Sequence, residues 1–540
     1  MRLPPLPHRP AATALALAGL TLAGVAEAAP LAVSGGSLTW GVTTEPVCFD
    51  PHRSSQQNAF FLIRNFVDSL IAKKADGSFA PWLAQSWAIS PDGRDYTFKL
   101  HPGVSFTDVT PFDAAAVKAN LDWVKNPANT AAAASFLVFY DHAEVIDPLT
   151  VKIVLTHADS TLLESFSSVK LGLLSPKILT ASADLCGGGP GVVGTGPFIF
   201  ESYRRGQSAS FVRNPAYAWP ADNADHAGPA YIDRVTYRFL PEYAVRAGAL
   251  SSGQVDVIEG VQPTDIGLFQ DVEGFQFLTG PSSETSFTLN VNYTIAPADD
   301  VRVRRALRDG FDLDAIVKSI YRGTVPRAWS IIGPSNASTA KSLVGTWGNN
   351  IAGANRLLDE AGWTGRDADG FRTKAGQKLR IEVGYPQPFV RDSRDILIEG
   401  IQAALRENIG LDLDVRIIGA AEWAKQTATG SWTIYPNTDN PSDAAMELWD
   451  MLGAGGFLYG NIKNPDSEIT GLIDKARLVP DPTQRQPILE AIQHRAVNQA
   501  FIVPLFAPHY QIAAKARVHG LGFEPQIDGP ASNYSVWIEK

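Results

Sequence analysis

The segment from residue 379 to residue 417 constrains the fold more than any other part of the sequence. Leu379–Gly384 and Asp412–Ile417 have the alternating pattern of strands, and Asp395–Asn408 between them has apolar residues at helical spacing. Two strands joined by a crossover helix form a βαβ unit, which places the strands in parallel. We therefore expect an α/β fold in which helices cover a partly parallel sheet.

The rest of the chain suggests more than one domain. A sequence of 540 residues is too long for a single core, so we expect two or three domains. The first half is rich in hairpin signals, such as the strands at 86–90 and 96–100 that flank Pro91-Asp92-Gly93. It also includes a predicted helix at Ala59–Leu70 and a helix capped by Asp113. After Phe287 the predicted helices become more frequent.

The first 28 residues have the features of a signal peptide. Arg2 and Arg9 provide a positive start, an apolar run covers Ala11 to Val25, and Ala26-Glu27-Ala28 fits the cleavage pattern. The apolar run is shorter than the ~20 residues that a membrane-spanning helix needs. We predict cleavage after Ala28 and export to the periplasm. No Cys stands at the cleavage point, so we expect a soluble protein and not a lipoprotein.

The net charge narrows the possible binding partners, and the cysteine content indicates a disulfide. The formal net charge of -10 argues against nucleic acid or an anionic membrane surface as a partner. Cys48 and Cys186 are the two cysteines of the chain. In an oxidising compartment such a pair favours a disulfide over two free thiols.

The segment Ser431–Asp443 is the strongest candidate for a binding loop. Trp432, Ile434 and Tyr435 suit a short buried strand, and the residues that follow Tyr435 are polar or Pro. Loops held by a rigid strand often carry binding groups, although an ordinary surface turn is the alternative. Tyr435 stands where strand becomes loop and could stack on a solute.

Several motifs receive a structural interpretation. Gly189, Gly191 and Gly194 have the spacing of a dinucleotide fingerprint, but Pro197 follows where that fingerprint needs a helix. The scattered histidines predict no zinc site, and no nucleophile can be paired with a base from the sequence. We interpret the arginines of residues 302–308 as a solvated, salt-bridged helix face rather than an anion site.

An ordered set of motifs resembles the extracytoplasmic solute-binding proteins of peptide and nickel type that serve ABC importers. The set follows the family's order over nearly all of the chain after residue 28. Its members are Phe49–His52, Pro81–Trp87, Ser90–Leu100, Thr110–Ala114, Val193–Phe198, Arg213–Pro215, Asp300–Leu307 and Leu357–Trp363.

The resemblance implies two lobes that enclose a solute, with an extra subdomain inserted in the first lobe. Two chain crossings would form a hinge, so that closure would be a rigid-body motion. The implied organisation is a signal peptide at 1–28, lobe I at 29–76, 195–288 and 514–540, the inserted subdomain at 77–194, and lobe II at 289–513.

The resemblance also indicates site residues and partners. Residues Tyr435, Asn437 and Asp439 are expected to face the cleft from the second lobe, and Arg53, Ser55 and Gln57 from the first. Tyr435 would stack and the polar groups would donate or accept hydrogen bonds. The expected partner is a membrane permease. No cofactor is required, and we expect a monomer.

The identity of the solute stays open at this stage. The peptide branch of the family has an aspartate where this chain has Asn437, and Asp439 could substitute for it. The nickel branch has an arginine just before a Ser-Pro-like segment, and the corresponding segment here, Val169–Pro176, has Lys170 but no Arg. We expect a peptide-like or other small polar organic solute, with a metal chelate as the alternative. A secreted hydrolase is the alternative from another class.

Overall fold

The computed structural model describes residues 32–540 except 55, 181–183, 283, 388–389, 440–442, 455, 457, 460–461, 463–464, 480 and 525–528. The predicted signal peptide at 1–28 lies outside these residues. The description below concerns the compact unit formed by residues 33–540.

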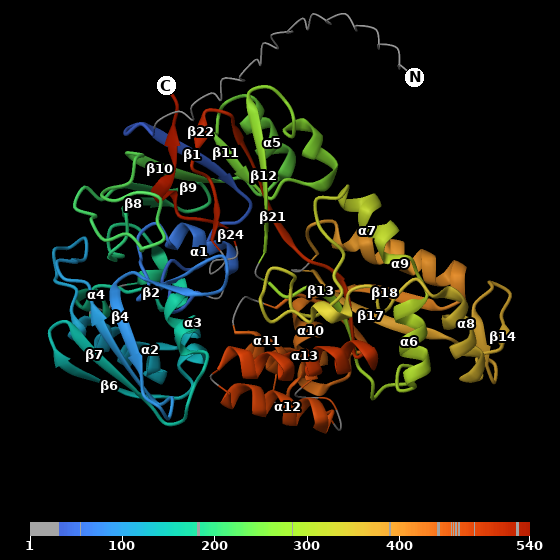
Figure 1. Ribbon diagram of the computed structural model, residues 1–540. Helices are drawn as coiled ribbons and strands as arrows, with labels where there is room; N and C mark the ends of the chain where they lie inside the picture. The colour runs from blue at the N-terminus through green and yellow to red at the C-terminus, as the bar shows by residue number, and fades with distance from the viewer. Residues whose placement is uncertain are drawn as a thin grey trace, which may run out of the picture. The chain divides into compact units, whose positions relative to one another are not determined.

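The first lobe is built on a seven-stranded mixed sheet, which includes the neighbouring strands β12 and β21 (Figure 1). Its strands, in spatial order, are β12 (Phe275–Pro281), β21 (His509–Lys515), β11 (Val257–Glu259), β1 (Ser37–Val42), β10 (Arg234–Phe239), β9 (Ser208–Arg213) and β8 (Phe198–Arg204). Its helices are α1 (Gln57–Ile63), α5 (Tyr243–Ser251) and the 3-10 turns η5 (Pro263–Leu268) and η9 (Asn533–Ser535). The short pairs β2 (Ile71–Lys73) with β3 (Phe79–Pro81), β22 (Val518–His519) with β25 (Trp537–Ile538), and β23 (Phe523–Glu524) with β24 (Gly529–Pro530) complete it.

The inserted subdomain contains a four-stranded antiparallel sheet, as the hairpin signals predict. Its order is β4 (Ala84–Ile89), β5 (Asp95–Leu100), β7 (Thr150–Leu155) and β6 (Tyr140–Asp147). Its helical segments are α2 (Ala114–Lys125), η1 (Pro127–Asn129), η2 (Ala132–Leu137), α3 (Leu162–Ser167), η3 (Val169–Leu171), α4 (Pro176–Thr180) and η4 (Leu185–Gly187). Asp113 caps α2 as expected, because its side chain accepts from the Ala116 N–H at 2.8 Å.

The second lobe is built on a five-stranded sheet. Its order is β18 (Asp412–Ile418), β17 (Arg380–Pro386), β19 (Ile434–Asn437), β13 (Phe287–Val291) and β20 (Ile502–Phe506). A small three-stranded sheet stands between α8 (Ile351–Glu360) and β17 in the sequence; its strands are β14 (Gly365–Arg366), β15 (Arg372–Lys374) and β16 (Gln377–Lys378). The helices are α6 (Val301–Asp309), α7 (Leu313–Tyr321), η6 (Lys341–Leu343), α8 (Ile351–Glu360), α9 (Arg394–Ile409), α10 (Ala420–Thr429), α11 (Ala444–Leu452), α12 (Ser467–Leu478) and α13 (Pro482–Asn498).

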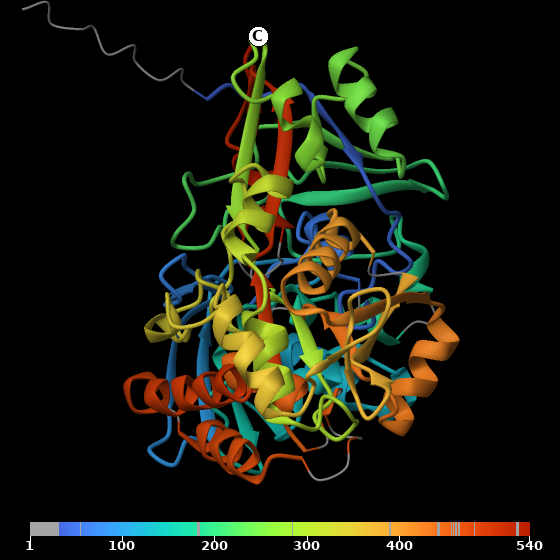
Figure 2. The same cartoon turned by 90° about the vertical axis from the view of Figure 1, so that its right-hand side faces the viewer.

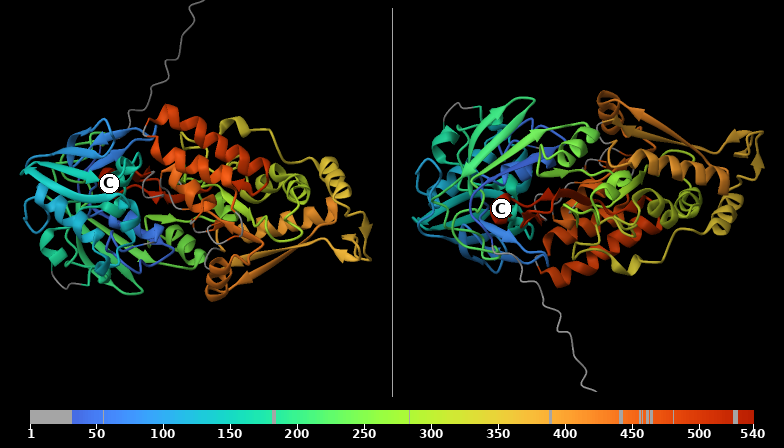
Figure 3. Two further views of the ribbon diagram at one scale, coloured as in Figure 1. Left: turned by 90° about the horizontal axis from the view of Figure 1, so that it is seen from below. Right: turned by 90° about the horizontal axis from the view of Figure 1, so that it is seen from above.

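The predicted βαβ unit is confirmed. Strands β17 and β18 pair in parallel, and α9 connects them. The mixed α/β fold is therefore confirmed as well. Helices α11, α12 and α13 lie together as the orange to red group in Figure 3.

The hydrophobic cores show which parts of the chain form one body. A single buried cluster joins Trp40 of β1 to Phe98 of β5, so the inserted subdomain shares its core with the first lobe. The second lobe has separate clusters, one around Leu289 and another around Leu448. Because packed cores resist deformation, we expect the inserted subdomain to move with the first lobe.

The chain crosses between the two large sheets twice, and the crossings lie side by side. The first runs from β12 to β13 and the second from β20 to β21 (Figure 2). The Ser282 N–H donates to the Pro508 carbonyl at 3.0 Å, which ties one crossing to the other. The second crossing lies between Phe506 and His509, ahead of the border expected at residue 513.

One local expectation is wrong, and a second holds only in part. The predicted helix at Ala59–Leu70 ends at Ile63, where the Asn65 amide donates to the Phe61 and Leu62 carbonyls and closes the last turn.

The arginines of α6 form the expected solvated, salt-bridged face only in part: the Arg302 side chain is 41% exposed and pairs with Asp300 at 2.6 Å. Arg304 and Arg308 are buried. Arg304, Arg305 and Arg308 donate to the carbonyls of Gln499, Asn498 and Val497, respectively. These carbonyls form the carboxyl end of α13, which favours cations.

The predicted disulfide between Cys48 and Cys186 is present, and it closes a sequence separation of 138 residues. It joins the loop before α1 to η4 at the end of the inserted subdomain. Such a cross-link reduces the entropy of the unfolded chain.

We predict that replacing both cysteines by alanine lowers the free energy of unfolding by about 2–4 kcal/mol. Urea denaturation of the variant and of the oxidised and reduced wild-type protein would measure this. The reduced wild type should lose stability like the variant. Equal midpoints for oxidised and reduced protein would contradict the prediction.

Asp68 is a buried carboxylate at the centre of the first lobe. It accepts hydrogen bonds from Thr195 Oγ1 at 3.1 Å, Trp219 Nε1 at 3.2 Å and Tyr217 Oη at 3.4 Å. Burial raises the pKa of Asp68 from 3.8 to about 7, although the nearby Arg64 and these donors oppose the rise. The folded protein therefore holds this proton more tightly than the unfolded chain does.

This pKa makes stability depend on pH. A raised folded-state pKa stabilises the fold at low pH, and that stabilisation is lost as the pH rises from about 4 to 7. We predict that the unfolding free energy of the wild type falls across this range relative to Asp68→Asn, which has no such proton. Urea midpoints at several pH values would test this, and parallel pH profiles would refute it.

Candidate functional site

A cavity of about 220 Å³ lies between the inserted subdomain and the second lobe; we call it the interlobe cavity. Its residues come from two stretches that are far apart in the sequence and belong to separate cores. The first wall comprises Ser135, Phe136, Val138, Phe139, Asp159, Thr161, Glu164, Ser165 and Lys170; the second comprises Asp439, Asp443, Met446, Trp449, Asp450 and Arg477.

Short helical segments and turns form the wall on the inserted subdomain. The Asp159 carboxylate accepts from the N–H and the hydroxyl of Thr161, at 2.9 and 2.7 Å, just before α3. Ser168 caps η3 by accepting from the Lys170 N–H at 3.2 Å. The buried His52 ring lies behind this turn, with Nε2 3.0 Å from the Gly172 carbonyl oxygen. These contacts fix the backbone on both sides of Lys170.

The Lys170 side chain brings a cation to the wall of the cavity. Its ammonium lies 5.4 Å from the Phe60 ring centre and 4.8 Å from that of Phe136. Among the described residues it forms no ion pair. Burial lowers the pKa of Lys170 to about 8, and the Asp439 carboxylate offsets part of this effect. A partly desolvated ammonium of this kind is stabilised by an anionic partner.

The wall on the second lobe is held by the first chain crossing. The Asp439 N–H donates to Thr285 Oγ1 at 2.7 Å, and the Thr285 N–H donates to the Asp439 carbonyl at 3.1 Å. Strand β19, which carries this loop, pairs with β13. Asp443 then caps α11 by accepting from the Ala445 N–H at 2.8 Å. The loop is thus fixed to the hinge at one end and to a helix at the other.

Both signs of charge meet in the cavity. The described lining residues include five carboxylates, from Asp159, Glu164, Asp439, Asp443 and Asp450, and the cations Lys170 and Arg477. Two of the carboxylates have basic partners behind the walls: Lys73 is 2.6 Å from Glu164 and Arg485 is 2.5 Å from Asp443. Burial raises the pKa of Asp159, hydrogen bonds from Thr161 oppose this, and Asp443 adds to the rise. An environment of this kind suits a solute that carries opposite charges.

Aromatic rings accompany the charges. The Arg477 guanidinium lies 5.6 Å from the ring centre of Phe139 and 5.5 Å from that of Trp449. Phe139 belongs to the inserted subdomain and Trp449 to α11. Arg477 therefore contacts both walls of the cavity.

Of the site residues expected from the sequence, Asp439 lines the interlobe cavity. Tyr435 is buried, with 2% of its surface exposed, and its ring stacks on Trp423 at 6.3 Å. Asn437 ends β19, and its carbonyl accepts from Thr288 Oγ1 at 3.2 Å. Neither Tyr435 nor Asn437 is among the described lining residues. Their contact with a solute stays a prediction.

The site residues expected from the first lobe are not among the described residues that line the interlobe cavity. Arg53 points to the η1 segment, donating from Nε to the Asn129 carbonyl at 3.1 Å, and lies 5.1 Å from the Trp123 ring centre. It is not among the described lining residues. Ser55 lies outside the described residues, and Gln57 begins α1. Ligand contact by these three residues also stays a prediction.

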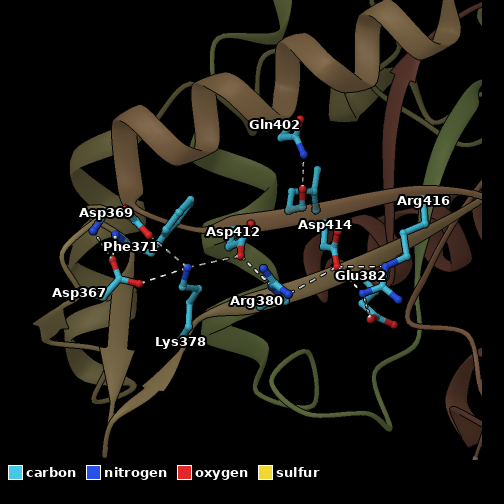
Figure 4. A network of polar contacts seen from close by, with 11 residues as sticks. Asp367, Asp369, Phe371, Lys378, Arg380, Glu382, Gln402, Asp412, Asp414 and Arg416 are labelled. Atoms are coloured by element: carbon cyan, nitrogen blue, oxygen red, sulfur yellow. Dashed lines mark hydrogen bonds and ion pairs between the residues drawn. The ribbon is translucent and has the colours of Figure 1, made fainter.

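A second hollow, of about 600 Å³, lies on the second lobe near β18 and α9. Figure 4 shows the polar network beside it, in which Lys378 approaches Asp367 at 3.3 Å and Arg380 approaches Asp412 at 2.7 Å. Of the residues that line this hollow, Asp369 and Asp412 approach Lys378 at 4.0 Å. All the described lining residues belong to the second lobe, so a solute bound there would not bridge the two lobes.

Among the described residues, no group of three or more His, Cys, Asp and Glu side chains is arranged to hold a metal ion. Among these same residues, no helix combines the length and the apolar character needed to cross a membrane.

Comparisons with known proteins agree with this architecture. The glutathione-binding protein GsiB of Salmonella paratyphi A is 29% identical over 520 residues, covering 94% of this chain and 96% of the relative. The structure of NikA from Brucella suis in complex with Fe(III)-EDTA matches with a TM-score of 0.82 and 25% identity over 93% of this chain and 100% of that chain. DppA from Helicobacter pylori in complex with peptide STSA matches with a TM-score of 0.73 and 21% identity over 94% and 99%.

These similarities confirm the predicted two-lobed binding-protein fold with an inserted subdomain. The family described as bacterial extracellular solute-binding proteins, family 5 Middle, matches residues 78–457, which is more than half of the 540 residues. The chain therefore belongs to the bacterial extracellular solute-binding proteins of family 5.

Proposed function

We propose that this protein is the solute-binding component of an ABC importer and encloses a peptide-like or other small polar organic solute in the interlobe cavity. The observation that carries the proposal is the placement of Lys170 and Asp439 on opposite walls of one cavity. A solute carboxylate would accept from the Lys170 ammonium, and a solute ammonium would donate to the Asp439 carboxylate. The solute would then bridge the two lobes.

The relatives support this assignment. GsiB is a glutathione-binding protein and DppA is bound to a peptide, and both solutes carry ammonium and carboxylate groups. NikA is bound to a metal chelate, so a chelate is the alternative within the same fold. The acidic residues of the cavity favour a solute with a cationic group over an anionic chelate.

We further propose export to the periplasm with cleavage of the signal peptide after Ala28. The closed protein would deliver its solute, as a monomer and without a cofactor, to a membrane permease. In this proposal it carries out no chemical reaction.

Native mass spectrometry of the purified protein tests the proposal, because enclosed solutes often remain bound. We expect a bound mass that fits a small peptide-like compound, and denaturation should return it chemically unchanged. A hydrolysed compound would support the hydrolase alternative. Binding of Fe(III)-EDTA, without binding of the dipeptide Met-Leu, peptide STSA or reduced glutathione, would support the chelate alternative.

We predict that affinity for Met-Leu falls as the pH rises through about 8, because the Lys170 ammonium loses its proton. Calorimetric titrations at pH 6.5 and 9 would measure this. Lys170→Met should bind about tenfold more weakly at the lower pH, where the charge-assisted bond is lost.

Lys170→Arg is the matched control, since it keeps its charge at both pH values. This variant has no lysine that can lose its proton in this pH range, whereas any titration of the dipeptide itself still affects the measured affinity. The same pH dependence in Lys170→Arg and in the wild type would show that Lys170 is not the titrating group.

We predict that Asp439→Asn weakens the binding of Met-Leu by about tenfold, because an amide accepts the hydrogen bond without the charge. The N-acetylated dipeptide, which lacks the ammonium, should show no such difference. Asp474→Asn on the exposed face of α12 is the control. Undiminished affinity in Asp439→Asn would remove Asp439 from the site.

A further inference from the structure

Arg485 on α13 connects the two walls of the interlobe cavity from behind. Its Nη1 donates to Ser160 Oγ at 2.9 Å, and its Nη2 pairs with Asp443 Oδ2 at 2.5 Å. Ser160 belongs to the inserted subdomain and Asp443 to the second lobe. The guanidinium therefore spans the boundary between two bodies with separate cores.

The partners of Arg485 adjoin the cavity, but Arg485 is not among its described lining residues. Ser160 stands between Asp159 and Thr161, which both line the cavity, and Asp443 lines it directly. Only 12% of the Arg485 side chain is exposed. A charged hydrogen bond shielded in this way is stronger than one on an open surface.

Electrostatics give this contact a second effect. Asp159 and Asp443 face the same cavity from opposite walls, and their mutual repulsion opposes closure. Arg485 pairs with Asp443, and Arg477 attracts Asp159. The contacts of Arg485 with both walls therefore favour the closed arrangement and offset part of that repulsion.

We infer that Arg485 is a positioning residue that holds the lobes closed and so slows the release of the solute. The contact between Arg485 and Ser160 exists only when the inserted subdomain meets the second lobe. Opening must break it before the solute can leave. This inference rests on the proposed function, because it concerns the solute held in the same cavity.

The test is the rate of solute release, measured by stopped-flow fluorescence with Met-Leu, reduced glutathione and peptide STSA as probes. Arg485→Met should release a bound probe about tenfold faster, as expected for the loss of one charge-assisted hydrogen bond. Association should change little, because encounter takes place in the open form. A fold defect would instead lower the fraction of protein that binds.

Ser160→Ala tests the same bond from the other lobe and leaves the pair of Arg485 with Asp443 in place. It should also speed release. The double variant should release the probe no faster than Arg485→Met alone, because both substitutions remove the same hydrogen bond between the lobes. Lys475→Met removes an exposed charge from α12 and should release like the wild type.

The outcomes separate this inference from the function on which it rests. If the wild type binds none of the three probes, the proposed peptide-like function fails. If the wild type binds a probe and both Arg485→Met and Ser160→Ala release it at the wild-type rate, the role of Arg485 is refuted while the proposed function stands.

Discussion

The two hydrogen bonds between Thr285 and Asp439 join the hinge to the cavity. Thr285 lies on the first crossing between the lobes, and Asp439 lines the cavity on the second lobe. Glu284, next to Thr285, is buried and pairs with Arg391 at 2.7 Å, which anchors this crossing to the second lobe. A solute group that binds Asp439, as proposed, would contact a residue that is hydrogen-bonded to the hinge. Binding and closure would share this element.

Separate cores make such a motion possible. The inserted subdomain packs with the first lobe in one cluster, whereas the second lobe has its own clusters. Polar contacts, such as that between Arg485 and Ser160, join the two walls beside the cavity. Polar contacts can form and break with hydration, while a continuous apolar core could not open without exposing its surface to water.

Much of the fold could be predicted from the sequence because its signals are local. Alternation and turn residues located the hairpins, and the spacing around α9 predicted the parallel pair β17 and β18. The disulfide was predicted from the single pair of cysteines, Cys48 and Cys186, together with the expected export of the chain. The buried arginines of α6 could not be predicted, because their acceptors lie at the end of α13, nearly two hundred residues later.

The cavity was harder to predict for the same reason. Asp439 lies next to a strand-to-loop signal, and Lys170 was visible only as a departure from a family motif. Asp159 and Phe139 lie in short connecting segments and Glu164 in the short helix α3, and only tertiary packing brings them to Trp449 and Arg477. Sequence reasoning therefore located one wall in part and missed most of the other.

Hydrogen exchange measured with and without Met-Leu tests the central claim most directly, namely that the solute lies between the inserted subdomain and the second lobe. The account predicts that the dipeptide protects backbone amides in both walls, at 135–139, 159–170 and 439–450. Binding with protection confined to the hollow at 366–413 on the second lobe would contradict it.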